Sequence, residues 1–372
     1  MRIFHLVPNL NYGGLQKVVE LLAACQIQGG HAVTIGCWTY QSNHPEAEAE
    51  LQAMGVKVVY LRRGEDGALS HGKRAALNKL KSYLGAGKAD ILHVHNPFGY
   101  LIYGAVAARL AGTTRSLITA HAMVMFDQPK FGRRGRTEFW IACMLMDGVV
   151  SVCDEVKSFL CKRFLLPSSK MFVVNNGIDL SRFLAIPDRV PREEIVFGTV
   201  GRMSQEKGHS ALIDAFALVH RKFAHVRLRL LGGGGLEMTL KQQVRDLGLD
   251  GVVEFCGFGN DVPGFLSTLD VYVLPSWSEA QPLGLMEAIA SGLPVVATAV
   301  GGVPNIVQTT DSGWLCEPNN PEGLAAAMEL AMANRDRAAL TARARILATQ
   351  LYSSQRMAAD YDGLYRKLIL RA

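Results

Sequence analysis

The sequence lacks paired cysteines, long apolar runs and a recognisable secretion signal. Its seven cysteines are odd in number and include no Cys-x-x-Cys pair, which favours reduced thiols in a reducing compartment over a disulfide framework. No uninterrupted apolar stretch reaches about 18 residues, so we expect no membrane-spanning helix. The opening residues, MRIFHLVPNLNYGG, contain an apolar run that is too short for a signal peptide and predicts a first β-strand instead.

Signatures of metal and dinucleotide chemistry are weak. The Asp-x-Asp sequence Asp360-Tyr361-Asp362 lies in the predicted C-terminal helical segment and not in a loop that follows a strand, and we expect no obligatory metal and no cofactor. His93 and His95 share one face of a predicted strand, but no carboxylate cluster accompanies them, which favours a packing or supporting role. The dinucleotide fingerprint Gly-x-Gly-x-x-Gly fails in the glycine run 232–235, because the sixth position is Glu237 or Met238, and a nicotinamide site loses most of its support.

Charge is sparse and unevenly distributed. Only 19% of the residues are charged and 49% are apolar, which argues against disorder and allows two hydrophobic cores within 372 residues. Residues 1–185 carry 21 Lys and Arg against 13 Asp and Glu, whereas the remainder carries 18 against 20. A basic first half is compatible with an anionic membrane, a phosphorylated acceptor or a nucleic acid, and equally with a solvated face that has no partner.

Short apolar runs alternate with amphipathic segments in the first half of the chain, and the pattern restarts in the second half. Such alternation predicts βαβ units, parallel sheets and two similar α/β domains. In the first half we predict strands at Arg2–Val7, Ala32–Trp38, Lys57–Leu61, Ile91–His95, Arg115–His121 and Gly148–Val152, and helices at Gly14–Gln28 and Tyr100–Ala111. In the second half we predict strands at Ile195–Val200, Val226–Leu231, Val252–Phe255, Val271–Leu274, Pro294–Ala297 and Gly313–Cys316, and helices at Ser210–Phe223, Leu236–Leu247, Leu285–Ser291, Pro321–Ala333 and in 335–372.

The stretch between the two series has the composition of a linker, with two prolines and several charges, at Asp179–Glu194. We therefore predict an N-terminal domain over residues 1–185, a C-terminal domain over 186–350, and a helical segment over 351–372 that packs back on the N-terminal domain. Open α/β sheets bind ligands at the carboxyl ends of their strands, so the two sheets are expected to face a shared cleft, with the chemistry in loops that follow strands.

Two of these loops are candidates for binding phosphate. Gly13-Gly14 precedes a predicted helix, whose N-terminus favours an anion, although a mere tight turn explains it as well. Arg202 and Lys207 follow the strand that ends at Val200, and two cations at this spacing can converge on a diphosphate or remain solvated surface charges.

The strongest signal is the segment from Pro275 to Ala288, PSWSEAQPLGLMEA, which follows a predicted strand. Glu279 lies in the loop, and Glu287 lies about one turn into the next helix, where a carboxylate suits the paired hydroxyls of a ribose or hexose. Pro282 and Gly284 shape a turn that leaves backbone N–H groups at the helix start, which is a site for phosphate. The alternative for the two glutamates is a surface acid and a capping acid.

At these residues the chain resembles the retaining glycosyltransferases of family 4, which have the GT-B fold of two Rossmann-like domains. Glu279 and Glu287 fit the family's E-x7-E motif within SEAQPLGLMEAIASGLPVVATAVGGVPNIV, and Arg202 and Lys207 fit its Arg-x4-Lys pair in GRMSQEKG. The segment VVNNGID at 173–179 is similar to the one that leads out of the first domain. The resemblance covers nearly the whole chain.

The resemblance implies a role for each matching residue. Arg202 and Lys207 would neutralise the donor diphosphate, Glu279 would contact the sugar hydroxyls, and Glu287 the ribose hydroxyls. Pro282, Leu283 and Gly284 would hold the sugar and the distal phosphate, and Phe258 would border the nucleobase. Gly14 would let the diphosphate approach the first domain. His121 would lie beside the transferred sugar, with a buried core histidine as the alternative. Gln281-Pro282-Leu283-Gly284 departs from a commoner Gly-Phe-Gly, which puts sugar preference in doubt.

The basic segment Lys130-Phe131-Gly132-Arg133-Arg134-Gly135-Arg136 is the candidate acceptor or membrane contact. Its cations, Lys130, Arg133, Arg134 and Arg136, are expected to bind a lipid-diphosphate acceptor or an anionic membrane surface, with a solvated charge run as the alternative. No nucleic-acid-binding module accompanies them, so we expect no nucleic-acid partner.

Taken with these features, the resemblance implies a metal-independent, retaining hexosyltransferase of polysaccharide or exopolysaccharide biosynthesis. It would move a sugar from a UDP- or GDP-sugar to a saccharide acceptor, with an undecaprenyl-diphosphate-linked saccharide as one candidate. The expected location is cytoplasmic, or peripheral at the inner face of the plasma membrane. The alternatives are a nucleotide-sugar epimerase, a pyridoxal-phosphate-dependent phosphorylase and a non-catalytic nucleotide-sugar-binding protein.

Overall fold

A computed structural model describes residues 1–11, 13–39, 45–62, 72–85, 88–96, 99–112, 115–121, 132–184, 194–259, 261–334 and 337–370. The chain forms two compact units, Met1–Gly177 with Ser354–Ala372, and Ile178–Ser353. The linker composition led us to expect the first boundary after residue 185. The structure divides the chain earlier, because Ile178 and Phe183 are already buried in the core of the second unit.

The first unit is built on a seven-stranded parallel sheet in the order β3-β2-β1-β4-β5-β6-β7. Its strands are β1 Arg2–Val7, β2 Ala32–Cys37, β3 Lys57–Tyr60, β4 Ile91–His95, β5 Arg115–Ala120, β6 Gly148–Ser151 and β7 Met171–Val173. Its helices are α1 Gly14–Gln28, α2 Pro45–Ala53, α3 Lys73–Leu84, α4 Leu101–Ala111, α5 Arg133–Leu145, α6 Asp154–Phe164 and α15 Ser354–Leu370.

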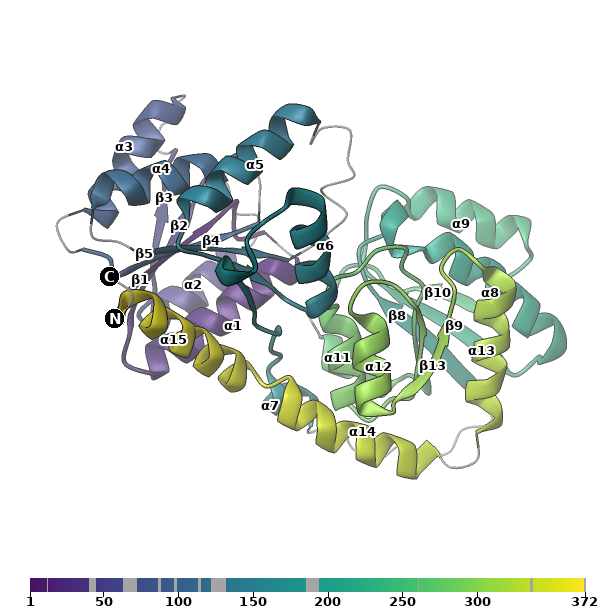
Figure 1. The fold of residues 1–372 in the computed structure, drawn as a ribbon. Helices are drawn as coiled ribbons and strands as arrows, with labels where there is room; N and C mark the ends of the chain where they lie inside the picture. The colour runs from purple at the N-terminus through teal and green to yellow at the C-terminus, as the bar shows by residue number, and fades with distance from the viewer. Residues whose placement is uncertain are drawn as a thin grey trace. The chain divides into compact units, whose positions relative to one another are not determined.

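Helices cover both faces of this sheet, with α1, α2 and α15 on one side and α3, α4 and α5 on the other (Figure 1). The division follows from right-handed crossovers, because the face that a connecting helix covers depends on the direction in which the chain moves along the sheet. The chain moves from β1 to β3 in one direction and then from β4 to β7 in the other. The connections from β3 onward all lie on the second side, so α1 and α2 alone would leave part of the first side bare. The C-terminal helix α15 packs beside α1 and fills that place.

The second unit is built on a six-stranded parallel sheet in the order β10-β9-β8-β11-β12-β13. Its strands are β8 Ile195–Val200, β9 Val226–Leu231, β10 Val253–Phe255, β11 Val271–Leu274, β12 Val295–Thr298 and β13 Gly313–Cys316. Its helices are α7 Leu180–Phe183, η4 Gln205–Lys207, α8 His209–Lys222, α9 Glu237–Asp246, α10 Val262–Ser267, α11 Leu283–Ala290, α12 Val303–Thr310, α13 Pro321–Ala333 and α14 Arg337–Leu351.

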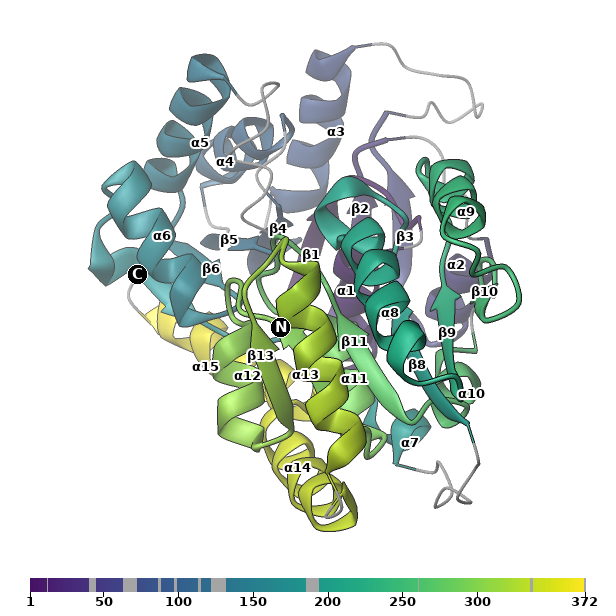
Figure 2. The same ribbon diagram turned by 90° about the vertical axis from the view of Figure 1, so that its right-hand side faces the viewer.

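Two hydrophobic clusters lie on opposite faces of the second sheet. One cluster joins α8, α9 and α13 to the sheet through residues such as Phe216 and Met328, and Figure 2 shows α8 and α13 side by side. The other joins α7, α10, α11, α12 and α14 through residues such as Ile289 and Ala344. Since both faces are covered, the strands read as unbroken apolar runs, such as the fully buried Val271–Leu274.

The predicted fold class of two parallel α/β sheets is confirmed. The strands that the sequence predicts all form, with ends shifted by no more than a residue, and β7 was missed. The helices α2, α3, α5, α6, α7, α10 and α12 were also missed. Of the helices in the described part of the chain, none has both the length and the apolar character that crossing a bilayer requires.

Candidate functional site

The candidate donor site lies where two neighbouring strands of the second sheet end. β8 and β11 pair directly, with Val271 opposite Phe197, so the loops that follow them leave the same edge of the sheet. The loop after β8 carries Arg202 and Lys207, and the loop after β11 carries Glu279. The main-chain N–H of Trp277 donates to the carbonyl oxygen of Glu206 at 2.8 Å and ties the two loops together.

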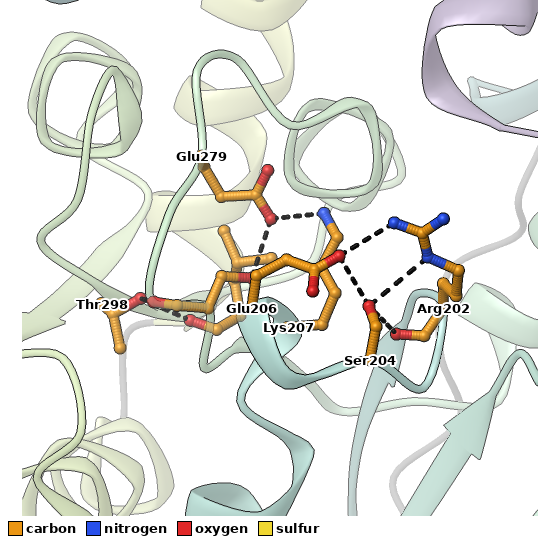
Figure 3. Close-up of polar contacts among 8 residues, drawn as sticks. Arg202, Ser204, Glu206, Lys207, Glu279 and Thr298 are labelled. Carbon is orange, nitrogen blue, oxygen red and sulfur yellow. Dashed lines mark hydrogen bonds and ion pairs between the residues drawn. The ribbon is translucent and has the colours of Figure 1, made fainter. Parts of the chain in front are cut away.

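An ion pair between Lys207 and Glu279 occupies the centre of this site (Figure 3). The Nζ atom of Lys207 lies 2.7 Å from Oε1 of Glu279, and the hydroxyl of Ser276 donates to the same oxygen at 2.7 Å. Glu279 is only 8% exposed, and burying a carboxylate is costly unless it is paired and hydrogen-bonded in this way. The loop itself is held by the hydroxyl of Thr298, which donates to the carbonyl oxygen of Ser276 at 2.5 Å.

Arg202 lies at the outer margin of the same loop, and its side chain is 71% exposed. Its Nη2 atom is 2.9 Å from Oε1 of Glu206, and the hydroxyl of Ser204 donates to that oxygen at 2.7 Å. Burial raises the pKa of Glu206, but the bonds from Ser204 and Arg202 outweigh it and leave the pKa below its usual range. The guanidinium therefore stays in place and remains accessible to a dissolved anion.

Glycines allow the loops of the site to pack backbone against backbone. Gly208 has a φ of 66°, and a Cβ atom there would lie 2.0 Å from the carbonyl oxygen of Pro275. Gly232 has a φ of 139°, and its Cβ would lie 2.0 Å from the carbonyl oxygen of Gly201. The first glycine of the run 232–235 is thus explained by the close approach of a neighbouring backbone.

The start of α11 supplies the third part of the site. Within the described residues, no side chain caps this helix, so the backbone N–H groups of Leu283 and Gly284 have no side-chain partner there. Gly284 packs over Tyr272, whose hydroxyl would lie 2.7 Å from a Cβ at this position. Burial raises the pKa of Tyr272, and the carboxylates of Glu279 and Glu287 raise it further, which places both glutamates near one phenol.

Other predicted donor contacts lie at separate points. Phe258 lies between β10 and α10 and is 62% exposed. It follows Gly257, which has a φ of 70°. In the first unit, Gly14 is the first residue of α1, directly after the β1 loop, and no described side chain caps that helix either. These positions are suited to a base and a phosphate, and their roles stay predictions.

His121 follows β5 directly, at the carboxyl edge of the first sheet. Its Nε2 atom lies 3.1 Å from Nδ1 of His95, and its main-chain N–H donates to Oδ1 of Asn96 at 3.1 Å. Burial lowers the pKa of His121 to about 3, so the ring is neutral near pH 7. A neutral imidazole at a strand end can donate one hydrogen bond and accept another.

His5, His93 and His95 form the group of side chains in the described residues that could hold a metal ion, with their ligand atoms within 4.8 Å of one another. All three are buried. The rings are already engaged, because His93 lies 2.8 Å from the hydroxyl of Tyr365 and 2.7 Å from that of Thr119. Both ring nitrogens of His93 are therefore already hydrogen-bonded. A metal ion would have to break these bonds, and the three histidines would give it no negatively charged ligand, so binding a cation here would be costly.

The basic residues predicted to contact an acceptor or membrane lie at the start of α5, except Lys130, which lies outside the described residues. Arg133 and Arg134 are exposed, and Arg134 pairs with Glu138 at 2.8 Å. Arg136 turns inward, where its Nε atom is buried without a hydrogen-bond partner among the described residues. Because helix positions recur every 3.6 residues, one exposed face joins Arg133 and Arg134 to Trp140 and Ile141, which are 44% and 40% exposed.

Sequence reasoning missed the polar residues that support the donor site. Ser204, Glu206, Ser276 and Thr298 hold the cations and Glu279 in place, and three of them flank the motif residues in the sequence. The sequence could therefore have indicated these supporting residues, since short polar side chains next to a motif often hold its charged members in place. Thr298 gave no such signal, because it ends the separate strand β12 and reaches the loop only in the fold.

Comparison with known protein families matches both halves of the chain. Residues 12–182 match the family described as "Glycosyltransferase Family 4", and residues 186–346 match "Glycosyl transferases group 1". A solved structure, Anabaena Alr3699/HepE in complex with UDP-glucose, is similar over 99% of this chain and 100% of its own, with a TM-score of 0.79 and 20% identity. The fold is therefore the GT-B fold.

The chain belongs to glycosyltransferase family 4. It is 34% identical over 167 residues to the putative colanic acid biosynthesis glycosyltransferase WcaL of Escherichia coli K12, covering 43% of this chain and 41% of that protein. It is 27% identical over 248 residues to the Escherichia coli UDP-Gal:alpha-D-GlcNAc-diphosphoundecaprenol alpha-1,3-galactosyltransferase, covering 63% and 64%. The matched segments thus span less than two thirds of either relative.

Proposed function

We propose that this protein is a retaining glycosyltransferase that moves a hexose from a nucleotide sugar to a saccharide acceptor in polysaccharide biosynthesis. The observation that carries the proposal is the half-buried Lys207–Glu279 ion pair beside the uncapped start of α11, in a chain of family 4. A carboxylate fixed next to a cation and free N–H groups suits a ligand with sugar hydroxyls at one end and phosphates at the other.

The donor is a UDP-sugar in this proposal, with a GDP-sugar as the variant to test. The structurally similar HepE is described in complex with UDP-glucose, which supports uridine as the base. Arg202 and Lys207 would neutralise the diphosphate, while the N–H groups at Leu283 and Gly284, with Pro282 shaping the turn, would hold its distal phosphate. Glu287 would contact the ribose, Phe258 the base, and Gly14 would let the diphosphate approach the first unit.

The chemistry assigned to these residues is charge stabilisation. Breaking the bond between the sugar and the phosphate develops negative charge on the leaving diphosphate, which Arg202, Lys207 and the helix N-terminus would stabilise without a metal. Glu279 would hold the sugar hydroxyls through its ionised carboxylate and would not form a bond to the sugar. The departing phosphate oxygen would take the acceptor's proton on the same face, which retains the anomeric configuration.

The acceptor is a lipid-linked saccharide, bound on the first unit near His121. One relative acts on an undecaprenol diphosphate-linked saccharide, which supports this class of acceptor. The exposed face of α5, with Arg133, Arg134 and Trp140, combines cations with an aromatic ring, as helices that lie in a membrane interface do. Arg136 and Lys130 complete the basic segment, and the proposed location is cytoplasmic and peripheral to an anionic membrane.

The test is a binding panel followed by a transfer assay. UDP-, GDP- and ADP-sugars are first compared by thermal shift, since a ligand that binds the folded state raises its apparent stability. Each donor that binds is then incubated with an undecaprenyl-diphosphate-linked saccharide and with free saccharides, and the products are measured by mass spectrometry. Transfer with a retained anomeric configuration is expected from a UDP-sugar. Epimerised donor without transfer, or binding without turnover, would overturn the proposal in favour of an epimerase or a binding protein.

A further inference from the structure

Four polar side chains form an unbroken hydrogen-bonded chain through the interior of the first unit. Oε1 of Gln26, on α1, lies 2.7 Å from Nε2 of His5 on β1. Nδ1 of His5 lies 2.9 Å from Nε2 of His95 on β4, and Nδ1 of His95 lies 3.1 Å from Nε2 of His121. Gln26, His5 and His95 are all buried, so water does not compete for these bonds.

The chemistry of the first member determines where every proton of the chain lies. Burial lowers the pKa of His5 to about 4 and that of His95 well below its usual range, so each ring is neutral and carries a single N–H. An amide oxygen can only accept, so Nε2 of His5 must donate to Gln26 and its Nδ1 must accept. It follows that Nε2 of His95 donates to His5, and that Nε2 of His121 donates to His95.

Gln26 is itself held in one orientation by a second contact. Its Nε2 atom donates to the hydroxyl of Tyr365 at 3.4 Å, which turns the amide oxygen toward His5. Tyr365 belongs to α15, the C-terminal helix that packs beside α1. The direction of the whole chain therefore depends on a contact between residues near the two ends of the sequence.

The chain ends at an unprotonated atom. Since Nε2 of His121 carries the proton, its Nδ1 carries a bare lone pair, and that atom is buried without a hydrogen-bond partner among the described residues. Leaving a buried acceptor without a partner is unfavourable, so a donor group that reaches it is favoured. His121 lies just after β5, at the carboxyl edge where sheets of this kind bind ligands.

We propose that Gln26, His5 and His95 are positioning residues that hold His121 as its Nε2-protonated tautomer, so that Nδ1 accepts a hydrogen bond from a hydroxyl of the transferred sugar. The other tautomer would present an N–H at the same place, and that hydroxyl would then have to turn its own hydrogen elsewhere. The assignment of the sugar rests on the proposed function, whereas the assignment of the tautomer does not.

A neighbouring branch of the same buried cluster provides matched controls. The hydroxyl of Tyr361 lies 2.9 Å from Oγ1 of Thr119, which in turn contacts His93. Neither Tyr361 nor Thr119 contacts the chain from Gln26 to His121 in these hydrogen bonds. Tyr361→Phe removes a buried hydroxyl that is joined to Gln26 indirectly, through Thr119, His93 and Tyr365. It leaves every hydrogen bond between Gln26 and His121 in place.

The first experiment needs no substrate. The full-length protein is labelled with ¹⁵N-histidine, and long-range ¹H–¹⁵N spectra at pH 7 report which ring nitrogen of each histidine carries the proton, with His121 assigned by comparison with His121→Asn. We expect His5, His95 and His121 to be single Nε2-protonated tautomers. Gln26→Met, which removes the accepting oxygen, should give His121 a mixed or Nδ1-protonated state, whereas Tyr361→Phe should not.

An Nδ1-protonated His121 in the unmodified protein overturns the proposal, even if Gln26→Met does not fold. An unchanged His121 signal in folded Gln26→Met overturns it as well.

The second experiment measures transfer kinetics. Gln26→Met should lower kcat about three- to tenfold, as expected for the loss of one hydrogen bond. Its affinity for UDP, which lacks the sugar, should be unchanged. Equal losses in Gln26→Met and Tyr361→Phe contradict a positioning role. Absence of transfer by the unmodified protein contradicts only the proposed function, since the spectra still report the tautomer.

Discussion

The carboxylate of Glu279 accepts from both Lys207 and Ser276 through one oxygen, Oε1, which leaves Oε2 as the atom that can meet a ligand. The side chain of Lys207 is 29% exposed, whereas that of Glu279 is 8% exposed, so solvent reaches the lysine more than its partner. The pair is thus arranged to bind a sugar hydroxyl on one member and a phosphate on the other. Removing the charge of either member should affect both functions.

Glu279→Gln tests this arrangement with little change of shape. We expect kcat/KM for the donor to fall about ten- to hundredfold, because hydrogen bonds to an ionised group are worth more than those to an amide. The control is Glu254→Gln, which removes the carboxylate that pairs with Arg229 at 2.7 Å elsewhere in the same unit. Nearly normal turnover and unchanged donor affinity in Glu279→Gln would remove Glu279 from the site.

Single residues differ in how far the sequence could predict them. Arg202, Lys207 and Glu279 carry the motif spacing, and they are brought together by loops that follow adjacent strands. Gln26 and Tyr365 are separated by 339 positions, and neither belongs to a motif. Their contact depends on α15 lying beside α1, which only the packing of the first unit determines. Local pattern therefore predicts charges in loops but not buried polar networks.

At the scale of elements, the start of α11 depends on close packing against β11. Gly284→Ala places a Cβ 2.7 Å from the hydroxyl oxygen of Tyr272, whereas the next contacts, the Cζ of that ring and the carbonyl oxygen of Val200, lie at an ordinary 3.6 Å. We expect the free energy of unfolding of the second unit to fall by about 1–3 kcal/mol, although alanine is otherwise favoured over glycine within a helix.

Tyr272→Phe supplies the control for that change, because it removes the single oxygen that the new methyl group meets. In the Tyr272→Phe background, Gly284→Ala should be neutral or slightly stabilising. Urea unfolding of the four proteins forms a double-mutant cycle. Equal destabilisation by Gly284→Ala in both backgrounds would show that the helix start is limited by something other than this contact.

The exposed face of α5 gives a second prediction about an element. Replacing both Arg133 and Arg134 by Glu should weaken binding to vesicles that contain phosphatidylglycerol at least about tenfold, because each basic residue near an anionic surface contributes about 1 kcal/mol. Lys162→Glu with Arg163→Glu, on the exposed end of α6, makes the same change of net charge at another place. Flotation that is equally reduced by both pairs, or by neither, would contradict a docking role for α5.

The sequence predicted best those helices and strands whose buried residues form a regular apolar pattern along the chain. Fully buried strands such as Val271–Leu274 give unbroken apolar runs, whereas β7 has three residues and no measurable period. The helix α2 buries only Ala47 and Leu51, which is a weak amphipathic signal. By contrast, α6 buries residues at a regular spacing of four, Val156, Leu160 and Phe164, so its pattern was present in the sequence and could have been found.

At the scale of the whole molecule, the two units differ in how many neutral histidines they bury. Burial lowers the pKa of His5 to about 4 and that of His121 to about 3, and holds the pKa of His93 and His95 well below the usual range. In the second unit the corresponding group is His209, whose pKa burial lowers to about 4. A difference of this kind makes the units respond differently to acid.

Acidification from pH 6.5 to 5.5 should therefore loosen the first unit before the second. In this range an unfolded chain binds protons at histidines with a pKa near 6.5, whereas the folded chain does not, so the free energy of unfolding falls as the pH falls. Over this pH unit the free energy of unfolding falls by about 1 kcal/mol for each buried neutral histidine. The first unit contains four such histidines, whereas the second contains His209, so the first unit should lose more stability.

The measurement is hydrogen exchange, corrected for its intrinsic pH dependence, in β4 and β11, whose residues are all buried. Protection should be lost first in β4, and His209→Leu should reduce the acid sensitivity of β11 alone. Equal loss in both strands would mean that the histidines of the first unit are not neutral when folded, or that the units do not open separately.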